Sequence, residues 1–160
     1  MPRSKSRKTA HPGRVRLPRQ VLLPLPDTYV RGQSLASHLA LAGCGAADGN
    51  QHSLNELIRI TYLAFLLWEA GYGDADAQLF FDSETALDTA VVRAQQNASW
   101  RLEETEAALM KRVLRLYDEQ LSGVPTRSFL MAEARLGNLL SKAGNASPIS
   151  RKAPSPRQSV

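Results

Sequence analysis

The fold of this chain is decided by residues 53–71, which read SLNELIRITYLAFLLWEAG. Ser53 and Glu56 have the spacing of a capping box, in which each side chain accepts a hydrogen bond from the other residue's backbone N–H. Apolar side chains then occupy nearly every side of the helix beyond Arg59, and a helix of that kind is usually surrounded by others. Gly71 is suited to end it. We therefore predict a central apolar helix over about 53–70.

Four further segments carry helix patterns, and the chain shows little strand pattern. Ser34 is placed to cap a short helix over about 34–42, in which Leu35, Leu39 and Ala42 share one side. The remaining predicted helices span about 75–96, 103–122 and 127–142. Together these segments predict an all-α fold, a four-to-five-helix bundle around the central helix.

Two local features of this bundle are also predicted. Residues 21–26 read VLLPLP and are expected to be extended, since each proline disfavours helix in the residue before it. Their leucines are expected to lie across the domain as a strap. On the helix over about 75–96, the acidic residues Asp82, Glu84 and Asp88 are expected to face solvent.

The charge of the chain is segregated. Residues 1–20 hold seven basic groups and no acid, and residues 141–160 hold four more, again without an acid. Residues 21–140 hold nine basic and fifteen acidic groups, a formal charge of −6. Because the ends have few large apolar side chains to bury, we expect a disordered basic arm over 1–20 and a disordered basic, Ser/Pro-rich tail over 144–160. A single helical domain is then expected over 21–143.

Flexible basic arms neutralise phosphates and release counterions, which gives salt-dependent binding that does not read sequence. The predicted nucleic-acid-binding residues are Arg3, Lys5, Arg7, Lys8, Arg14, Arg16 and Arg19. The competing interpretation is that the arms serve solubility alone.

Catalytic and metal-binding patterns are weak. Cys44 stands between two glycines with His38 and His52 nearby in sequence, but the spacing matches no known nucleophile or zinc motif. A calcium loop beginning at Asp74 lacks the required Gly and Glu, so Asp74 and Asp76 are better read as acids at a helix start. No phosphate loop, dinucleotide fingerprint or nucleophile elbow occurs. We expect no enzymatic activity, no cofactor, no metal and no small-molecule substrate.

A helix-turn-helix interpretation applies to LSGVPT, residues 121–126, with Arg127, Ser128 and Arg135 on the second helix facing a DNA groove. The position four before the turn glycine normally holds a small residue packed between the two helices. Here it is Glu119, whose buried charge would be costly. An ordinary helical hairpin is the preferred interpretation.

The apolar stretch within 58–68 is about 11 residues long, well short of the roughly 20 that a membrane span needs. A single cysteine and the lack of an apolar segment after the basic N-terminus suit a soluble cytoplasmic protein. No membrane partner is expected.

Three segments carry a family resemblance: LASHLAL at 35–41, YLAF at 62–65, and LYDEQL at 116–121 with Val124-Pro125. In these the chain resembles small uncharacterised proteins of proteobacterial conjugative plasmids and integrative elements, some automatically labelled Fis-like transcriptional regulators. The likeness covers about residues 20–140 and consists of packing and turn residues, so no functional residue is carried over. It implies a role in the regulation or maintenance of a mobile element.

Two functions are therefore expected. The first is a DNA-associated regulatory or accessory protein, in which the basic arms bind nucleic acid and the bundle supplies self-association or recruitment. The alternative is a helical protein–protein interaction module, an adaptor or inhibitor whose tails only aid solubility.

Overall fold

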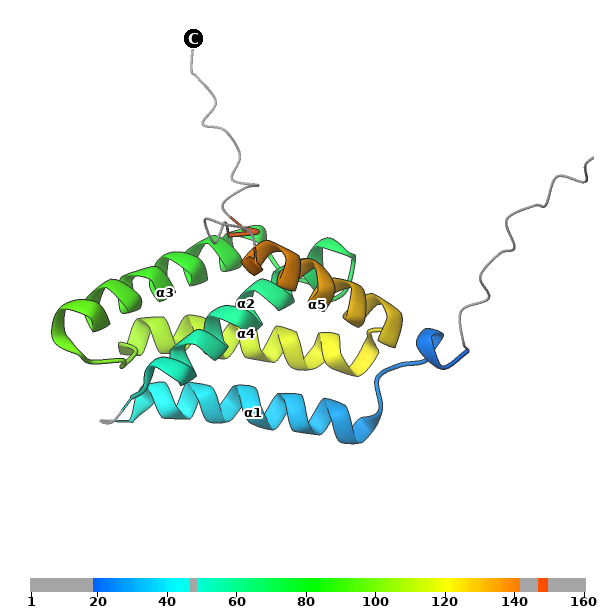
Figure 1. Cartoon of the computed structure of the whole chain (residues 1–160), viewed down its shortest axis with the longest axis horizontal. Coiled ribbons are helices and arrows are strands. Elements are labelled where there is room, and N and C mark those ends of the chain that lie inside the picture. Colours follow the sequence, from blue (N-terminus) through cyan, green and yellow to red (C-terminus); the bar gives the residue numbers. More distant parts are fainter. Residues whose placement is uncertain (1–18, 47–48, 142–146, 150–160) are drawn as a thin grey trace, which may run out of the picture.

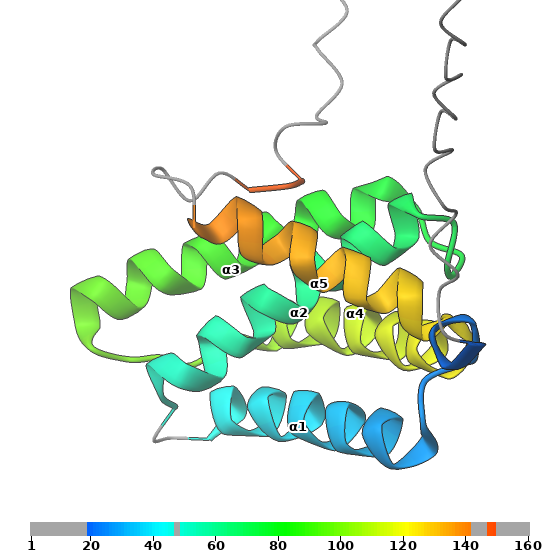
Figure 2. The same ribbon diagram turned by 45° about the vertical axis from the view of Figure 1, so that its right-hand side comes forward.

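The computed structural model describes residues 19–46, 49–141 and 147–149, and for Arg19 and Gln20 it describes the backbone alone. A short 3-10 helix, η1 (Arg19–Leu22), precedes five α-helices. These are α1 (Asp27–Gly45), α2 (Gln51–Glu69), α3 (Ala77–Asn97), α4 (Glu104–Gly123) and α5 (Thr126–Ser141). Figures 1 and 2 show that they form a bundle. Within the described part, pairing of β type is confined to one isolated bridge, between Pro24 and Pro125.

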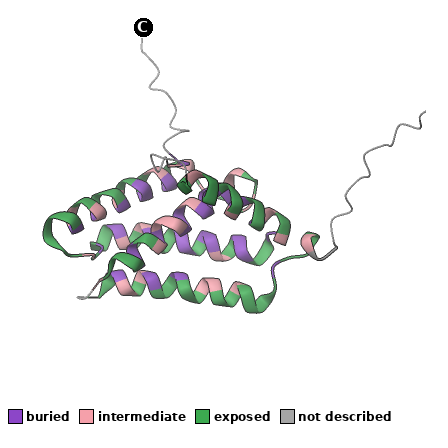
Figure 3. Cartoon of the chain, in the orientation of Figure 1, coloured by how far each residue is buried: buried purple, intermediate pink, exposed green. Residues whose placement is uncertain are grey.

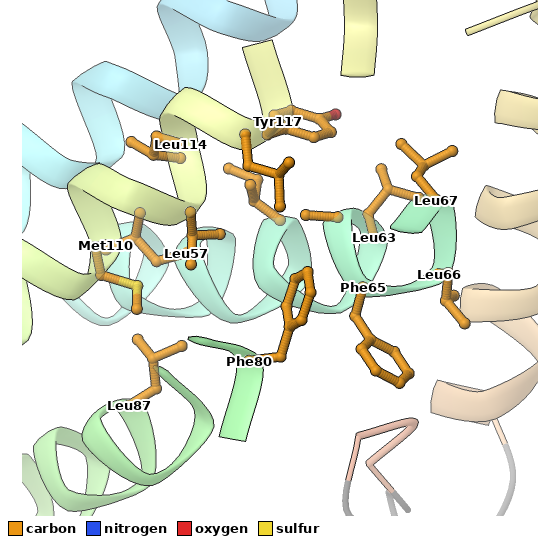
Figure 4. Close-up of a cluster of buried hydrophobic side chains, with 14 of the residues drawn as sticks. Leu57, Leu63, Phe65, Leu66, Leu67, Phe80, Leu87, Met110, Leu114 and Tyr117 are labelled. Atoms are coloured by element: carbon orange, nitrogen blue, oxygen red, sulfur yellow. The ribbon is translucent and has the colours of Figure 1, made fainter. Parts of the chain in front are cut away.

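Helix α2 is the centre of the bundle. It packs against α1, α3, α4 and α5, and its apolar side chains from Leu54 to Leu67 are almost fully buried except for the partly buried Ile58 and Tyr62. Figure 4 shows Leu57, Leu63 and Phe65 of this helix among side chains of α3 and α4. The predicted all-α bundle around a central apolar helix is confirmed.

The residues that begin these helices differ in part from the prediction. Asn50, not Ser53, caps α2, because the Asn50 side chain accepts the Ser53 backbone N–H at 2.8 Å. At the start of α3, Asp76 does act as the cap and accepts the Gln78 N–H at 3.0 Å. The predicted Ser53–Glu56 capping box is therefore wrong, and α2 begins two residues earlier than expected.

Helix α1 is much longer than the predicted helix over about 34–42. Its N-cap is Pro26, whose carbonyl accepts the N–H groups of Tyr29 and Val30, so Ser34 lies inside the helix and does not cap it. The helix continues through Gly43 to Gly45. A Cβ at Gly43 would lie 2.7 Å from Ser53 Oγ of α2. The glycine thus lets two helices approach closely instead of ending one of them.

The apolar side of α1 faces solvent. The helix buries its small residues Ser37, Ala40 and Cys44, whereas Leu35 and Leu39 are 61% and 60% exposed. Figure 3 shows that exposed positions make up much of α1, the outermost helix in this view. The side that Leu35, Leu39 and Ala42 share is therefore not the side that packs in the bundle.

One acidic residue of α3 departs from the expected solvent-facing position. Asp82 and Asp88 are exposed, but Glu84 is buried and accepts a hydrogen bond from the Tyr62 hydroxyl of α2 at 3.2 Å. The turn spacing places Glu84 one turn from buried Phe80 and Leu87, so it lies toward α2 with them.

The expectation of an extended segment over 21–26 is wrong for Val21 and Leu22, which belong to the 3-10 helix η1, and the residues after them form the strap through a backbone contact. The carbonyl oxygen of Leu23 accepts both the N–H of Thr126 at 2.8 Å and its hydroxyl at 3.0 Å. Leu25 is buried in the core, while Leu22 and Leu23 remain exposed. The strap thus joins the turn between α4 and α5, and one leucine of the three anchors it.

Part of the expected C-terminal tail belongs to the packed body. Ile149 is fully buried in the core, and its N–H donates to Ser147 Oγ at 3.0 Å. The expectation of disorder over 144–160 is therefore wrong for residues 147–149. The rest of that tail, and residues 1–18 of the expected basic arm, lie outside the described residues.

Candidate functional site

The predicted nucleic-acid-binding residues are connected to the body through η1 and the strap. Arg3, Lys5, Arg7, Lys8, Arg14 and Arg16 lie outside the described residues, and Arg19 is the first residue of η1. From there the chain passes over the start of α5, against which η1 packs. The arm is thus joined to the body beside the α4–α5 turn, at a point held by the two bonds between Leu23 and Thr126.

The first turn of α5, at this point of attachment, carries a cation. The N-terminus of α5 carries the positive end of its helix dipole. Arg127, in the first turn of α5, is exposed, and the first acidic residue of that helix is Glu133. An arm that begins at Arg19 is therefore attached beside one exposed cation of α5, with Asp27 of α1 following the strap.

Several basic side chains elsewhere on the body lie beside acids. Arg93 of α3 contacts Glu103 and Glu106 at 2.6 Å each, and Arg135 of α5 contacts Glu69 at 3.0 Å. Arg112 and Arg115 of α4 line an open depression together with Asp74, Asp76 and Glu119. At these positions, acids offset the basic charge of the described surface.

The α4–α5 segment does not have the arrangement of a helix-turn-helix. Helix α5 packs mainly against α2 and η1 (Figures 1 and 2), not against α4 as in that motif or in the hairpin preferred above. Glu119 is exposed, so it does not occupy a position between the two helices. Of the candidate reading residues, Ser128 bonds the Tyr72 hydroxyl at 2.8 Å and Arg135 pairs with Glu69.

A polar cluster crosses the interface of α2 with α5. Arg59 binds Glu56 at 2.7 Å and lies 3.7 Å from Glu133. The hydrogen bond from Arg59 lowers the pKa of Glu56 below its ordinary value of 4.5. Burial raises the pKa of the nearby Tyr117 well above its ordinary value, so the phenol stays protonated. These groups hold helices together and have no geometry suited to proton transfer with a substrate.

A second polar cluster joins α2 to α3. Burial, and then the charge of Glu84, raise the pKa of Tyr62 to about 12. The same two causes raise the pKa of Asp88. Tyr62 and Asp88 also line an open cleft of about 410 Å³ with Ile58, Val91 and other residues. The residues that line this cleft include one carboxylate, a phenol and the Arg59 guanidinium but no nucleophile paired with a base, so it makes a weak candidate for chemistry.

The Cys–His arrangement considered from the sequence is not assembled. Cys44 is fully buried, and burial raises the pKa of its thiol to about 11, which keeps it protonated and unreactive. The His38 ring nitrogen Nε2 lies 2.9 Å from Asp118 Oδ2 of α4, and His52 is exposed at the start of α2. Among the described residues, no group of three His, Cys, Asp or Glu side chains is arranged to hold a metal ion.

The surface feature that sequence reasoning did not anticipate is the outer side of α1. Leu35 and Leu39 are among the most exposed large apolar side chains of the described body, and they lie one turn apart on the same helix. The spacing of these leucines was visible in the sequence, but it indicated an apolar side without saying whether that side packs inward.

No family model, curated protein or solved structure matches this chain. Within the described residues, none of the helices combines the length and apolar character that a membrane crossing requires.

Proposed function

We propose that this chain is a non-enzymatic, DNA-associated regulatory or accessory protein of a bacterial mobile element, which binds nucleic acid through its basic arms. The observation that carries the proposal is the charge segregation: seven basic groups and no acid in residues 1–20, against a formal charge of −6 over residues 21–140. Nucleic acid is the commonest polyanion in a cell. The setting on a mobile element is taken from the resemblance described above.

The charge of the body supports the assignment of nucleic-acid binding to the arm. Arg112 and Arg115 on α4 share a depression with three acids, and residues 21–140 carry a formal charge of −6, so the bundle itself has little attraction for a polyanion. The first turn of α5 with Arg127 lies where the strap brings the chain in from Arg19. An arm attached there would bring phosphate toward the exposed cation Arg127 at the N-terminus of α5.

The test compares two full-length variants that lower the net charge equally. In the arm variant, Arg3, Lys5, Arg7 and Lys8 are changed to Gln. In the body variant, the exposed residues Arg101, Lys111, Arg112 and Arg115 are changed to Gln. Affinity for a duplex of unrelated sequence is measured over a salt series for both variants and for the unmodified protein.

The proposal expects log affinity to fall with log salt for the unmodified protein, because bound counterions are released. The arm variant should bind at least about tenfold more weakly at low salt, with a slope shallower by up to about 3–4, since each lost phosphate contact removes about 0.9. The body variant should change much less. A full chain that does not bind DNA at low salt ends the proposal, and a larger loss in the body variant assigns binding to the bundle.

The alternative function, a helical protein–protein interaction module, is favoured by a different observation. Leu35 and Leu39 leave an apolar surface on α1 that the bundle does not use. Exposed apolar surface of this kind is typical of interaction sites. The two functions are compatible, because one relies on the arms and the other on the body.

A further inference from the structure

The outer side of α1 carries a regular line of uncharged side chains, which we name the α1 seam. It consists of Thr28, Gly32, Leu35, Leu39, Ala42 and, at the C-cap, Ala46, all of them exposed. The spacings alternate between four and three residues, which is the repeat of a helix seam that packs against another helix. Buried Ser37, Ala40 and Cys44 occupy the opposite side. The seam therefore points directly away from the bundle.

We propose that the α1 seam binds the α1 seam of a second copy of this chain, with the two helices antiparallel. The seam is symmetric about Ser37 in both spacing and side-chain size. In an antiparallel pair centred there, Leu35 of each copy meets Leu39 of the other, while Gly32 meets Ala42 and Thr28 meets Ala46. Large side chains thus meet at the centre and small ones at the ends, so an identical helix has the complementary pattern.

The charges of α1 also favour a second copy of this chain as the partner of the seam. From Gly32 to Gly45 the ionisable side chains of the helix are His38, which is engaged with Asp118, and the buried Cys44. The antiparallel pair would place Arg31 level with Gly43 of the other copy. The last turn of α1 contains no basic residue of its own, and a cation near the C-terminal carbonyls of a helix is favourable. Each copy would supply the cation that the other lacks.

The seam is short, and this sets the strength of the pair. Helix α1 has 19 residues and is therefore about 28 Å long, and the seam is flanked by little other surface because it points away from the bundle. Such a contact is smaller than a standard protein interface. We expect weak, reversible association with a dissociation constant on the order of 10–100 μM.

Antiparallel pairing would also bring two basic arms into one assembly. The strap enters α1 at Asp27, and the two Asp27 positions would lie about 30 Å apart along the seam, with each arm leaving its copy at Arg19, before the strap. A pair would therefore present two arms to one duplex. This consequence rests on the proposed function, whereas the pairing itself does not.

The test measures the mass of the full chain in solution, without DNA, from about 10 μM to about 1 mM. The unmodified protein should shift from the 17.6 kDa monomer toward a dimer as its concentration rises. The double variant Leu35→Glu/Leu39→Glu should remain monomeric, because it places four carboxylates together in the pair. A control variant, Met131→Glu, changes a side chain that is also 61% exposed but lies on α5, and it should associate like the unmodified protein. All substituted positions are exposed, and circular dichroism with a thermal melt checks that each variant is folded.

The unmodified chain staying monomeric at about 1 mM would overturn the proposal. So would a double variant that still dimerises, or loss of the dimer in Met131→Glu, since each assigns the contact to another surface. If the unmodified protein dimerises but does not bind DNA at low salt, the result contradicts the proposal that the arms bind DNA and leaves the pairing intact.

Orientation is tested by cysteine cross-linking. Gly32→Cys and Ala42→Cys variants, mixed under mild oxidation, should form a disulfide between unlike chains at least about tenfold faster than either variant alone. Gly32 has no atom within 4 Å of an added Cβ, so the substitution fits the monomer. The native Cys44 does not compete because it is fully buried and its thiol pKa is raised. Faster self-cross-linking of Gly32→Cys would indicate a parallel pair and overturn the antiparallel arrangement.

Discussion

Thr126 and Leu23, which are 103 residues apart in the chain, are joined by two hydrogen bonds. The backbone N–H of Thr126 donates to the Leu23 carbonyl oxygen at 2.8 Å, and the Thr126 hydroxyl donates to the same oxygen at 3.0 Å. A threonine at the start of α5 thus holds the N-terminal segment to the body. The strap is therefore part of the fold, and the basic arm begins from a fixed point.

The first prediction concerns the anchoring of this strap. Leu25→Ala should lower the free energy of unfolding by about 2–3 kcal/mol, because Leu25 is 7% exposed and its removal leaves a cavity in the core. Leu23→Ala, two residues earlier in the same strap, should change it by less than about 0.5 kcal/mol, since that side chain is exposed. Urea unfolding of both variants measures the difference, and equal losses would contradict the anchoring role of Leu25.

The second prediction concerns Gln120, a buried amide that links three segments. Its Nε2 donates to the carbonyl oxygens of Ala64 at 2.9 Å and Tyr72 at 3.0 Å. Gln120→Leu should lower the free energy of unfolding by about 1–2 kcal/mol through the loss of these two bonds. Gln120→Glu should lower it by about 3 kcal/mol or more at pH 7, because a carboxylate would then be buried against two carbonyl oxygens. A Glu variant as stable as the Leu variant would show that water reaches this position.

The third prediction concerns the turn between α2 and α3. Gly71 and Gly73 both have positive φ, at 92° and 81°, which alanine adopts at a cost of about 1 kcal/mol. A Cβ on Gly71 would meet nothing, whereas one on Gly73 would lie 2.6 Å from Leu116 Cδ1 and 3.2 Å from Gln120 Cγ. Gly73→Ala should therefore lower the free energy of unfolding by about 2 kcal/mol or more, and Gly71→Ala by about 1 kcal/mol. Thermal unfolding that ranks the two variants in the opposite order would be inconsistent with this turn.

The fourth prediction is a pH dependence carried by Glu56. The hydrogen bond from Arg59 lowers the pKa of this carboxyl in the folded state below its ordinary value of 4.5. The stabilisation is therefore fully present above about pH 4.5 and is lost as the pH falls through the lower, folded-state pKa. Glu56→Gln should be less stable than the unmodified protein by about 1 kcal/mol at pH 7, and the difference should be smaller at pH 3.

Urea unfolding at both pH values checks this dependence. Glu104→Gln, at an exposed position in the first turn of α4, serves as the control and should show a much smaller change between the two conditions. A Glu56→Gln penalty that is the same at pH 3 as at pH 7 would assign the effect to packing and not to the charge on Glu56.

Much of the helical content could be predicted because it depends on local pattern. The apolar run after Arg59 identified α2, and the predicted helices over 75–96, 103–122 and 127–142 agree with α3, α4 and α5 to within two residues at each end. Helix starts were less accurate where two residues of similar capping ability compete. Asn50 and Ser53 are both good caps, and the longer helix wins because Asn50 accepts the Ser53 N–H.

The candidate site was predicted from composition alone. The seven basic residues of 1–20 can be counted in the sequence and do not depend on how the body folds. The place where they attach could not be predicted, because it depends on Thr126 meeting Leu23 across the whole length of the chain. The Thr126 hydroxyl, at the first residue of α5, is one of the two donors that fix this place.

The sequence by itself determined that this protein is a set of helices around one apolar segment and that its basic charge lies at the ends, since both follow from local composition and periodicity. Tertiary structure alone decided which side of each helix is buried. Close contact of α1 with α2 requires a residue without a side chain at Gly43, and α1 buries the small residues Ser37, Ala40 and Cys44, so Leu35 and Leu39 are directed outward. The position of Glu84 opposite the Tyr62 hydroxyl likewise draws an acid inward. A helix pattern gives the order of side chains around an axis, but the neighbouring helices determine which of them are covered.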